Sequence, residues 1–355
     1  MISPPVSSKP QHFQRKRMKT FQSADHYSLC FTVIMPVCNG GDNLRRSLEA
    51  LATSTRPPDE VIVIDDSSSD GSADMARNYE VKVISISDGS QGSYVARNLG
   101  AKAAQGNILV FIDADVAVRS DTLARIERYL IKHPEIDALF GSYDADPAVR
   151  TLVSRYKNLL HHYVHQHSPR EASTFWTGCG AIRREVFDEM GGFDISCRTI
   201  RDIELGGRLR RAGKQVWLCP EIQVKHLKHW KLTTMIRSDI FDRAIPWTRL
   251  IVGNTSMPNE LNLKKGNLVS ASAAWMTLGF LVTGFLFPWA WIGMVLSMVT
   301  LGVLNADLYH FFFQQGGLGF AAGAAGLHFL YLLYSSMTFA LISGQTRLSP
   351  KKKQE

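Results

Sequence analysis

The stretch NILVFIDADV, residues 107–116, is an apolar run that ends on two carboxylates separated by one residue. Its apolar half has the length and composition of a buried β-strand that places Phe111 and Ile112 in the sheet. Asp113 and Asp115 then set two negative charges close together. Such an arrangement costs free energy unless a cation or hydrogen bonds compensate it. The stretch therefore predicts a strand end that binds a ligand.

The segments before this strand alternate between apolar runs and helical patterns. Leu44, Leu48 and Leu51 mark one face of a helix, and a further helix runs through Ala101. The other strands that we predict here are FTVIMPV (31–37), VIVID (61–65) and VKVISI (81–86). Strands alternating with helices are typical of an α/β fold with a mostly parallel, doubly wound sheet flanked by helices.

Polar or special residues follow three of these strands. They are Pro36 and Asn39, Asp65 and Asp66, and Asp113 and Asp115. In doubly wound sheets ligands bind beyond the carboxyl ends of the strands, so we expect the three ends to line one crevice. Gly89 and Gly92 precede a helix that contains Arg97, and its amides could face an anion. Turn geometry is the alternative explanation for these glycines.

Beyond residue 140 the pattern is less regular. We predict a helix over about 149–163, a helix over RDIELGGRLRRAG (201–213), and two short strands, QVWLCP (215–220) and EIQVKH (221–226). The second helix begins on carboxylates, which the helix dipole favours, and ends at Gly213.

The last part of the chain is strongly apolar, and between Leu268 and Ile342 its only formal charge is Asp307. Apolar runs at 268–287, 289–304 and 318–342 predict two or three transmembrane helices, and 305–317 is a candidate for lying in the membrane interface. A buried helical hairpin is the alternative. Three full spans would put the C-terminal lysines opposite Lys264, against the positive-inside tendency, so the number of spans stays open.

The formal net charge of +8 includes basic clusters that flank the apolar regions. Such clusters suit an anionic membrane surface, and without an aromatic-basic recognition motif they do not predict nucleic-acid binding. Five cysteines without a Cys-x-x-Cys pair are typical of a reducing cytosol. The predicted organisation is a basic mobile arm (1–28), an α/β domain (29–230), an interfacial linker (231–267), a transmembrane region (268–342) and a basic tail (343–355).

The paired carboxylates suit two kinds of binding. Asp113 and Asp115 suit a divalent cation whose remaining coordination positions suit diphosphate oxygens. Asp65 and Asp66 are acceptors suited to nucleobase N–H and ribose hydroxyl groups. Solvated loop acids and helix caps are the alternative roles, and the combination of three strand ends favours a binding site.

Five motifs over about residues 30–230 together resemble family two glycosyltransferases of the GT-A fold. They are PVCNGG, VIVIDDSSSDGS, ARNLGAKAAQGNILVFIDADV, TGCGAIRREVFDEMGGFD and RDIELGGRLRRAG. The resemblance implies an inverting transferase that uses a nucleotide-activated sugar and a divalent metal, Mn²⁺ or Mg²⁺. It implies nucleoside contacts at Asp65 and Asp66 and a metal–diphosphate motif at Asp113 and Asp115. Further donor contacts are expected at Pro36, Asn39, Arg97 and Gly178.

The resemblance also implies residues that would act on the sugar acceptor. Inversion is an in-line displacement that needs a general base for the acceptor hydroxyl, and Asp202 resembles the family's base. Most members have Glu before this Asp, whereas this chain has Arg201, which leaves open the roles of Arg201 and Glu204 toward the acceptor or the diphosphate. His226 resembles a position where some members supply a further metal ligand, and imidazole suits Mn²⁺ better than Mg²⁺.

Two departures from the family's pattern, and one further segment, indicate which type of family member this chain resembles. Cys38 stands where the family commonly has Tyr. No Gln-x-x-Arg-Trp follows Asp202, and because that motif marks chain-polymerising members, a single transfer is favoured over processive synthesis. Arg243 and Trp247, in FDRAIPWTRL (241–250), suit either a lipid phosphate or anchoring at the membrane surface.

The sequence thus predicts a multi-pass membrane protein with a cytoplasmic catalytic domain. We expect an inverting hexosyltransferase that moves a single sugar from a nucleotide-sugar donor to a membrane-associated acceptor, most simply a lipid. A processive polysaccharide synthase is the alternative among enzymes. A non-catalytic nucleotide-sugar sensor or membrane scaffold is the alternative from another class, and Arg201 is its only sequence support.

Overall fold

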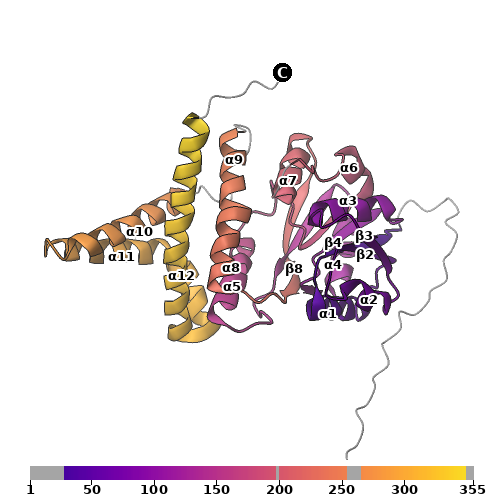
Figure 1. Ribbon diagram of the computed structural model, residues 1–355, viewed down its shortest axis with the longest axis horizontal. Helices are drawn as coiled ribbons and strands as arrows, with labels where there is room; N and C mark the ends of the chain where they lie inside the picture. The colour runs from indigo at the N-terminus through magenta and orange to yellow at the C-terminus, as the bar shows by residue number, and fades with distance from the viewer. Residues whose placement is uncertain (1–27, 197–199, 254–264, 349–355) are drawn as a thin grey trace, which may run out of the picture. The chain divides into compact units, whose positions relative to one another are not determined.

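A computed structural model of the protein describes residues 28–196, 200–253 and 265–348 (Figure 1). The chain divides into two compact units, each described here by itself. Unit 1 combines the chain up to residue 142 with 170–196 and 201–228, and unit 2 contains 143–169 and the chain from residue 229 on. Nearly all of the predicted basic arm, Lys264 and the end of the predicted basic tail lie outside the described residues.

Unit 1 is built on an eight-stranded sheet with the order β3-β2-β1-β4-β7-β6-β8-β5. The strands are β1 (Phe31–Val37), β2 (Glu60–Asp66), β3 (Lys82–Ile86), β4 (Ile108–Ile112), β5 (Val116–Val118), β6 (Ala138–Tyr143), β7 (Cys179–Arg183) and β8 (Val216–His226). The first four positions in the sheet are parallel, as predicted. The sheet as a whole is mixed, because β7 pairs antiparallel with both β4 and β6, and β5 pairs antiparallel with β8.

Helices cover both faces of this sheet. They are α1 (Gly41–Ala52), α2 (Ser72–Arg77), α3 (Ser93–Ala103), α4 (Thr122–Lys132), α6 (Arg184–Glu189) and α7 (Arg201–Arg211). Figure 1 shows α3, α6 and α7 on one face and α1, α2 and α4 on the other. The predicted apolar face of α1 is correct, since Leu44, Leu48 and Leu51 are fully buried. Burial on both faces explains why β1, β2 and β4 read as continuous apolar runs.

An aromatic cluster fixes the position of β4 in the core. Phe111 is fully buried, and its ring centroid lies 6.2 Å from that of Phe175, 5.5 Å from Phe187 and 5.3 Å from Phe193. Tilted and edge-on pairs at these separations are favourable beyond the area that they bury. The residue two positions before Asp113 therefore anchors the strand end to the helices of one face.

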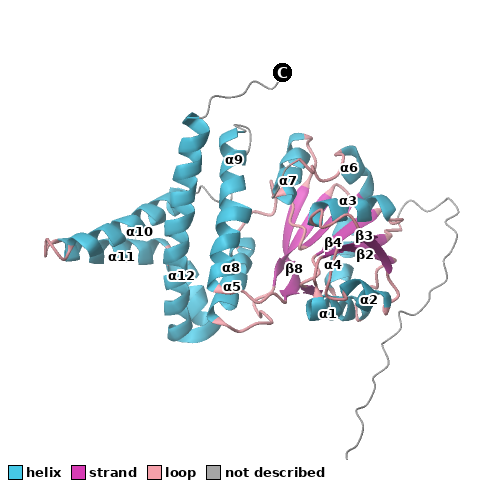
Figure 2. Ribbon diagram, viewed as in Figure 1, coloured by secondary structure: helices cyan, strands magenta, loops and turns pink. Residues whose placement is uncertain are grey.

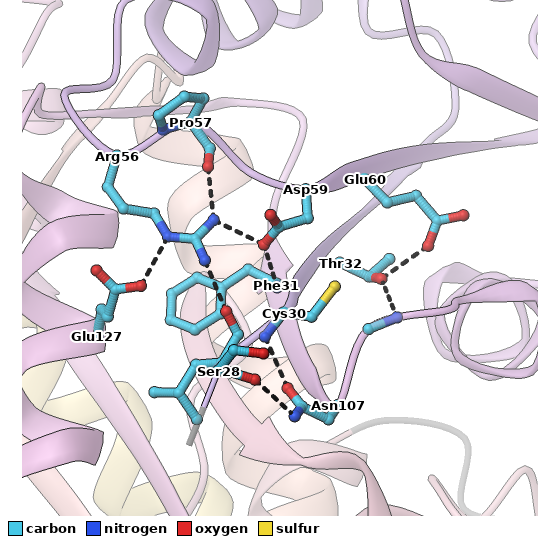
Figure 3. Close-up of polar contacts among 12 residues, drawn as sticks. Ser28, Cys30, Phe31, Thr32, Arg56, Pro57, Asp59, Glu60, Asn107 and Glu127 are labelled. Carbon is cyan, nitrogen blue, oxygen red and sulfur yellow. Dashed lines mark hydrogen bonds and ion pairs between the residues drawn. The ribbon is translucent and has the colours of Figure 1, made fainter. Parts of the chain in front are cut away.

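The opposite end of the sheet is fixed by polar contacts around Arg56 (Figure 3). The Arg56 guanidinium donates to Asp59, to Glu127 and to the backbone carbonyls of Pro57 and Leu29, and it lies 4.4 Å above the Phe31 ring. Asn107 accepts from the Cys30 amide, and Thr32 donates to Glu60 at 2.7 Å. These contacts hold the starts of β1, β2 and β4 in register, so the strands also end together.

The structure corrects several sequence predictions in the second half of unit 1. The two short strands predicted at 215–226 are one strand, β8. At Pro220 the strand has no β5 partner, because β5 pairs only with Val224–His226, and such edge positions tolerate proline. β5, β6, β7, α4 and α6 were not predicted.

Unit 2 is helical and contains the apolar part of the chain (Figure 2). Its helices are α5 (Leu152–Gln166), α8 (Leu232–Arg237), the π-helix η1 (Ser238–Ala244), α9 (Ile245–Gly253), α10 (Lys265–Thr283), α11 (Ala290–Leu304) and α12 (Ala306–Leu348). The helix predicted at 149–163 is α5, which begins and ends three residues later. The segment 143–169, predicted as part of a 29–230 domain, groups with unit 2. Tyr156 and Leu159 of α5 pack there with Phe312 and Phe320 of α12.

Two helices of unit 2 are long and apolar enough to cross a membrane, at Gly266–Thr283 and Ala306–Thr346. The run predicted at 289–304 forms the shorter helix α11, which Thr277 and Ser297 join to α10 through a hydroxyl–hydroxyl hydrogen bond of 2.8 Å. Gly317 has φ 71° and a non-helical backbone, so α12 is kinked at the end of the segment predicted to lie in the interface.

Replacing Phe111 should destabilise unit 1 strongly. Phe111→Ala leaves a cavity among three phenylalanine rings, and we expect it to lower the free energy of unfolding by about 3–5 kcal/mol. Ile131→Ala is the matched control, because the Ile131 side chain is 63% exposed and its loss should cost no more than about 0.5 kcal/mol. Thermal and urea unfolding of the full chain would measure both. A loss below about 1 kcal/mol for Phe111→Ala would contradict the packing described.

Candidate functional site

The strand ends that the sequence predicts to form a site lie together, where the parallel strands β1, β2 and β4 have their carboxyl ends. This end of the sheet is called the sheet edge below. In the parallel pair β1 and β2, Val37 is opposite Asp65, and β4 lies on the other side of β1. The antiparallel strand β7 begins at this same edge, because Cys179 is opposite Ile112. β8 ends there too, with His226 opposite Val116. The edge includes the point between β1 and β4 where the strand order reverses, as in other doubly wound sheets that bind ligands.

Asp113 forms an ion pair with Arg97 from α3. The Arg97 side chain is 5% exposed and donates to Asp113 through Nη2. Its Nε and Nη1 groups are buried and have no hydrogen-bond partner among the described residues. Buried guanidinium N–H groups without partners are costly, so they suit an anionic ligand with several acceptor oxygens.

Asp115 lies beside His226, with 3.9 Å between Oδ2 and Nε2. Burial raises the pKa of both Asp113 and Asp115 above the ordinary value for a carboxyl group, although 31% and 28% of their side-chain surfaces remain exposed. The charges of Arg97 and Lys228 oppose this rise in pKa without cancelling it. Burial thus disfavours the ionised form of both carboxylates, and a bound cation would favour it.

The turn that contains Asp113 and Asp115 is held in place by α1, which lies on the face of the sheet opposite to α3 (Figure 1). Ser47 of α1 is fully buried and donates through its hydroxyl to the carbonyl of Ala114 at 3.0 Å. The Val116 amide donates to the carbonyl of Asp113, and the Leu227 amide to that of Asp115. The backbone of the turn is thus fixed on three sides, and the two carboxylates are held in place before any ligand binds.

Asp65 and Asp66 are both buried but differ in their contacts. Asp66 accepts from the Gln91 amide at 2.7 Å, the Gly92 amide at 2.8 Å and the Ser90 hydroxyl at 2.7 Å. It therefore holds the loop that leads into α3. Asp65 accepts one longer bond, 3.3 Å, from the Ser68 amide. Of the two predicted nucleoside contacts, Asp65 has the greater remaining capacity to accept from a ligand.

The other three residues predicted to contact the sugar donor differ in their burial and in their contacts. Asn39 has φ 55° and joins two loops, since its side-chain oxygen accepts from the Ser69 amide at 2.8 Å. Pro36 is buried inside β1. Gly178 is buried, and a Cβ there would lie 2.3 Å from the Trp176 ring, so glycine is required for this close packing.

Asp202 lies in the first turn of α7, where the helix dipole favours its negative charge. Its Oδ1 accepts from the Ile203 amide at 3.0 Å. Burial and the charge of the nearby Asp202 raise the pKa of Tyr94 well above its ordinary value. Arg201 is 8% exposed, donates to the carbonyl of Ile195 and lies 5.3 Å above the Tyr94 ring. Arg201, the neighbour of Asp202, is therefore linked through Tyr94 and Arg97 of α3 to Asp113.

The remaining predicted contacts have other partners or lie elsewhere. Both oxygens of Glu204 accept from Arg208, at 2.7 and 2.8 Å, so this carboxylate is engaged in a bidentate pair. Arg243 and Trp247 belong to unit 2, in η1 and α9. Arg243 is exposed, and the buried indole Nε1 of Trp247 has no hydrogen-bond partner among the described residues.

Sequence reasoning missed two residues of the cluster, Tyr94 and Lys228. Lys228 is exposed and follows β8, close enough to lower the pKa of both candidate metal-site carboxylates. Its signal in the sequence was its place two residues after His226. Tyr94 had no local signal beyond its position after the glycines that open α3.

An acidic edge on a doubly wound α/β sheet, with a buried arginine available to an anion, defines a candidate nucleotide-binding enzyme. Residues 32–191 match the family model of Glycosyl transferase family 2. This part of the chain, a little under half of it, is similar to that family, and the predicted resemblance to family two glycosyltransferases is confirmed.

Two relatives with assigned names agree with this. The chain is 39% identical over 189 residues to Glycosyltransferase AglE of Haloferax volcanii, a match that covers 51% of this chain and 62% of that protein. It is 26% identical over 232 residues to the O-antigen chain rhamnosyltransferase RfbN of Salmonella typhimurium. This match covers 61% of this chain and 73% of that protein. The match to the archaeal relative thus spans less than two thirds of that protein.

One solved structure shares the fold over nearly the whole chain. The mannosyltransferase PcManGT from Pyrobaculum calidifontis, in complex with GDP-Man and Mn²⁺, superposes with a TM-score of 0.54. The match covers 94% of this chain and 92% of that protein at 19% sequence identity. The predicted fold class, a GT-A-type α/β sheet followed by apolar C-terminal helices, is confirmed.

Removing the Asp66 carboxylate should loosen the loop before α3. Asp66→Ala deletes three hydrogen bonds to a charged acceptor, each contributing about 1.5–3 kcal/mol. We expect the Gln91 and Gly92 amides to exchange with deuterium at least about tenfold faster, measured by mass spectrometry. Asp65→Ala is the matched control and should leave exchange of these two amides unchanged. Equal protection in Asp66→Ala and the wild-type chain would contradict this role.

Proposed function

We propose that the protein transfers a single sugar, with inversion, from a nucleotide-sugar donor to a membrane-associated acceptor, most simply a lipid. The observation that supports this most directly is the cluster at the sheet edge. Asp113 and Asp115 there suit the leaving-group side, and Arg97 and Tyr94 link them to Arg201, whose neighbour Asp202 suits a base.

On the donor side, the chain offers groups for each part of a nucleoside diphosphate. Asp65 suits the nucleoside because its carboxylate keeps acceptor capacity. The two unpartnered N–H groups of Arg97 suit diphosphate oxygens, which would satisfy them on binding. Pro36, Asn39 and Gly178 would shape the pocket through their backbone.

Asp115 and His226 suit a divalent cation, because a carboxylate oxygen and a ring nitrogen lie 3.9 Å apart at a strand end that carries two carboxylates. Among the described residues no group of three or more His, Cys, Asp or Glu side chains is arranged for a metal. The protein would therefore supply two ligands and leave the remaining positions to diphosphate oxygens and water. When bound, the cation would stabilise negative charge on the departing diphosphate.

On the acceptor side, Asp202 would act as general base. Its ionised carboxylate would take the proton of the acceptor hydroxyl while that oxygen forms a bond to the anomeric carbon. The bond from this carbon to the diphosphate oxygen breaks on the opposite side, which inverts the configuration. The α7 dipole and the hydrogen bond from the Ile203 amide support the ionised form.

The apolar helices support a membrane location by their length and composition. An active site held at a bilayer meets lipid acceptors at a raised effective concentration, which motivates the lipid proposal. Arg243 and Trp247 suit the acceptor's polar group or the membrane surface. Unit 1 would lie on the cytoplasmic side of the membrane, where nucleotide sugars would reach it.

Replacing Asp202 should abolish most of the transfer. We expect Asp202→Asn to lower kcat by a factor of about 10² to 10⁴, the usual contribution of a general base. The assay would use GDP-mannose and a panel of UDP-sugars with lipid extracts and Mn²⁺, and mass spectrometry would read the size of the product. Asp121→Asn, which removes a surface carboxylate paired with Arg125, is the control. Full activity of Asp202→Asn would exclude the mechanism, and a polymeric product would exclude single transfer.

Removing divalent cations should stop the reaction. We expect EDTA to abolish transfer, and Mn²⁺ or Mg²⁺ to restore it. His226→Ala should raise the Mn²⁺ concentration needed for half-maximal activity, because one of two protein ligands is lost. His133→Ala is the control, since His133 also lies beside a carboxylate, with 3.1 Å to Glu135. Undiminished transfer in EDTA would contradict a metal requirement.

The membrane location is testable independently of activity. The full chain, expressed in cells, should stay in the membrane pellet after extraction with alkaline carbonate, because that treatment releases proteins bound by charge alone. A known peripheral protein serves as the control in the same extract. Release of the chain into the supernatant would contradict membrane insertion of α10 and α12.

A further inference from the structure

We propose that Trp176 forms the surface that contacts the ring of the transferred sugar, and so belongs to the donor site. This inference rests on the proposed function, because it assigns the sugar part of the donor to a residue of that site. Trp176 lies in the loop just before β7, and the sequence predicts no ligand contact for it.

An inverting transfer defines where the sugar ring must lie. The acceptor oxygen attacks the anomeric carbon from the side of the base, and the diphosphate leaves on the opposite side. The ring that carries this carbon therefore lies between the residues proposed for the base and those proposed for the diphosphate. A side chain that contacts the ring has to come from a segment that reaches both.

The loop before β7 reaches the base through its backbone. The amide of Phe175, next to Trp176, donates to the backbone carbonyl of Asp202 at 3.3 Å. Gly206 of α7 lies so close to this loop that a Cβ there would be 2.4 Å from the Cα atom of Thr174. The loop is therefore fixed against the first half of α7, and Trp176 follows directly.

The side chain of Trp176 reaches the diphosphate side of the site. A Cβ at Gly178 would lie 2.3 Å from Cζ2 and 2.9 Å from Nε1 of the indole. Cys179 pairs with Ile112, so Gly178 and Asp113 are the next residues beyond this pair, at the same end of two neighbouring strands. The indole therefore rests on backbone beside the strand end that suits the leaving group.

The two adjacent aromatic residues of the loop differ in burial. Phe175 is fully buried and packs edge-on against Phe111, whereas Trp176 is only partly buried and packs at the margin of the same core. A partly exposed indole among charged groups suits a ligand that has both apolar and polar surfaces. A pyranose ring is such a ligand, because its C–H groups can lie on the aromatic face while its hydroxyls meet the charged groups.

The close packing on Gly178 also holds the indole in position. Because the ring is already confined, little side-chain freedom is lost when a sugar binds to it. The predicted donor contact at Gly178 thereby gains a physical reason. The glycine makes room for the ring that would contact the sugar.

Trp176→Leu removes the aromatic surface and keeps an apolar side chain. Calorimetry on the full chain with Mn²⁺ would give the Kd for GDP-mannose, a panel of UDP-sugars, GDP and UDP. We expect the Kd of the donor that binds the wild-type chain most tightly to rise about tenfold, the effect of losing apolar contact equivalent to about one methylene group. The Kd of its own nucleoside diphosphate should change by less than about twofold, because the indole would not contact that part.

Two further variants separate sugar contact from packing. Trp217→Leu is the matched control, because Trp217 is also partly exposed but lies at the opposite end of β8 from His226, with its ring centroid 4.9 Å from that of His133. Every Kd should stay within about twofold of wild type in this variant. Trp176→Phe keeps an aromatic face and should bind the donor more tightly than Trp176→Leu.

Two outcomes would overturn the sugar contact. Equal rises in Kd for the donor and its nucleoside diphosphate in Trp176→Leu would mean that the residue only packs. A raised KM for the acceptor with an unchanged donor Kd would assign the indole to the acceptor instead.

Binding and turnover are read separately, which distinguishes this inference from the proposed function. If Trp176→Leu selectively weakens donor binding but the wild-type chain transfers no sugar to any acceptor, the sugar contact stands and the proposed function fails. If transfer proceeds and every donor Kd is unchanged in Trp176→Leu, the sugar contact alone is overturned. A wild-type chain that binds no nucleotide sugar would overturn both.

Discussion

Negative charge at the end of an apolar strand is the constraint on which the candidate site depends. Phe111 holds β4 in an aromatic cluster, and the chain then turns so that Asp113 and Asp115 emerge together. Their burial is unfavourable to ionisation, as their raised pKa values indicate. The charges of Arg97 and Lys228 oppose this rise in pKa, and a bound cation would oppose it further. The apolar core and the acidic edge are therefore parts of one arrangement, since the first fixes where the second lies.

Much of this arrangement was predictable because its signals are local. Three strands are apolar runs that stop at acidic or turn-forming residues, and parallel pairing then brings their ends to one edge. β5, β6 and β7 were missed. β5 is three residues long, and β6 contains Gly141, where a Cβ would lie 2.2 Å from the Ile222 carbonyl oxygen. Short or closely packed strands have weak periodicity, and tertiary contacts decide their form.

The division of roles among the acidic residues was not predictable in the same way. Asp65 and Asp66 are adjacent in the sequence, but Asp66 holds a loop 24 to 26 residues away, while Asp65 stays more available. Glu204 belongs to the same motif as Asp202 and is engaged by Arg208. The contact between the Tyr94 ring and the Arg201 guanidinium joins two helices that no sequence spacing relates. Motifs identify which residues gather, and only the fold determines which of them remain available to a ligand.

The path of the chain has a consequence for modularity. The chain leaves unit 1 at residue 142, returns at 170, and leaves again before residue 229. Helix α5 therefore precedes β7 and β8 in the sequence, yet packs Tyr156 and Leu159 against α12, near the other end of the chain. A soluble fragment cut at residue 230 would keep α5 but remove the helix that covers its apolar face. A single recombination point therefore cannot separate unit 1 from unit 2. We expect the two units to evolve together.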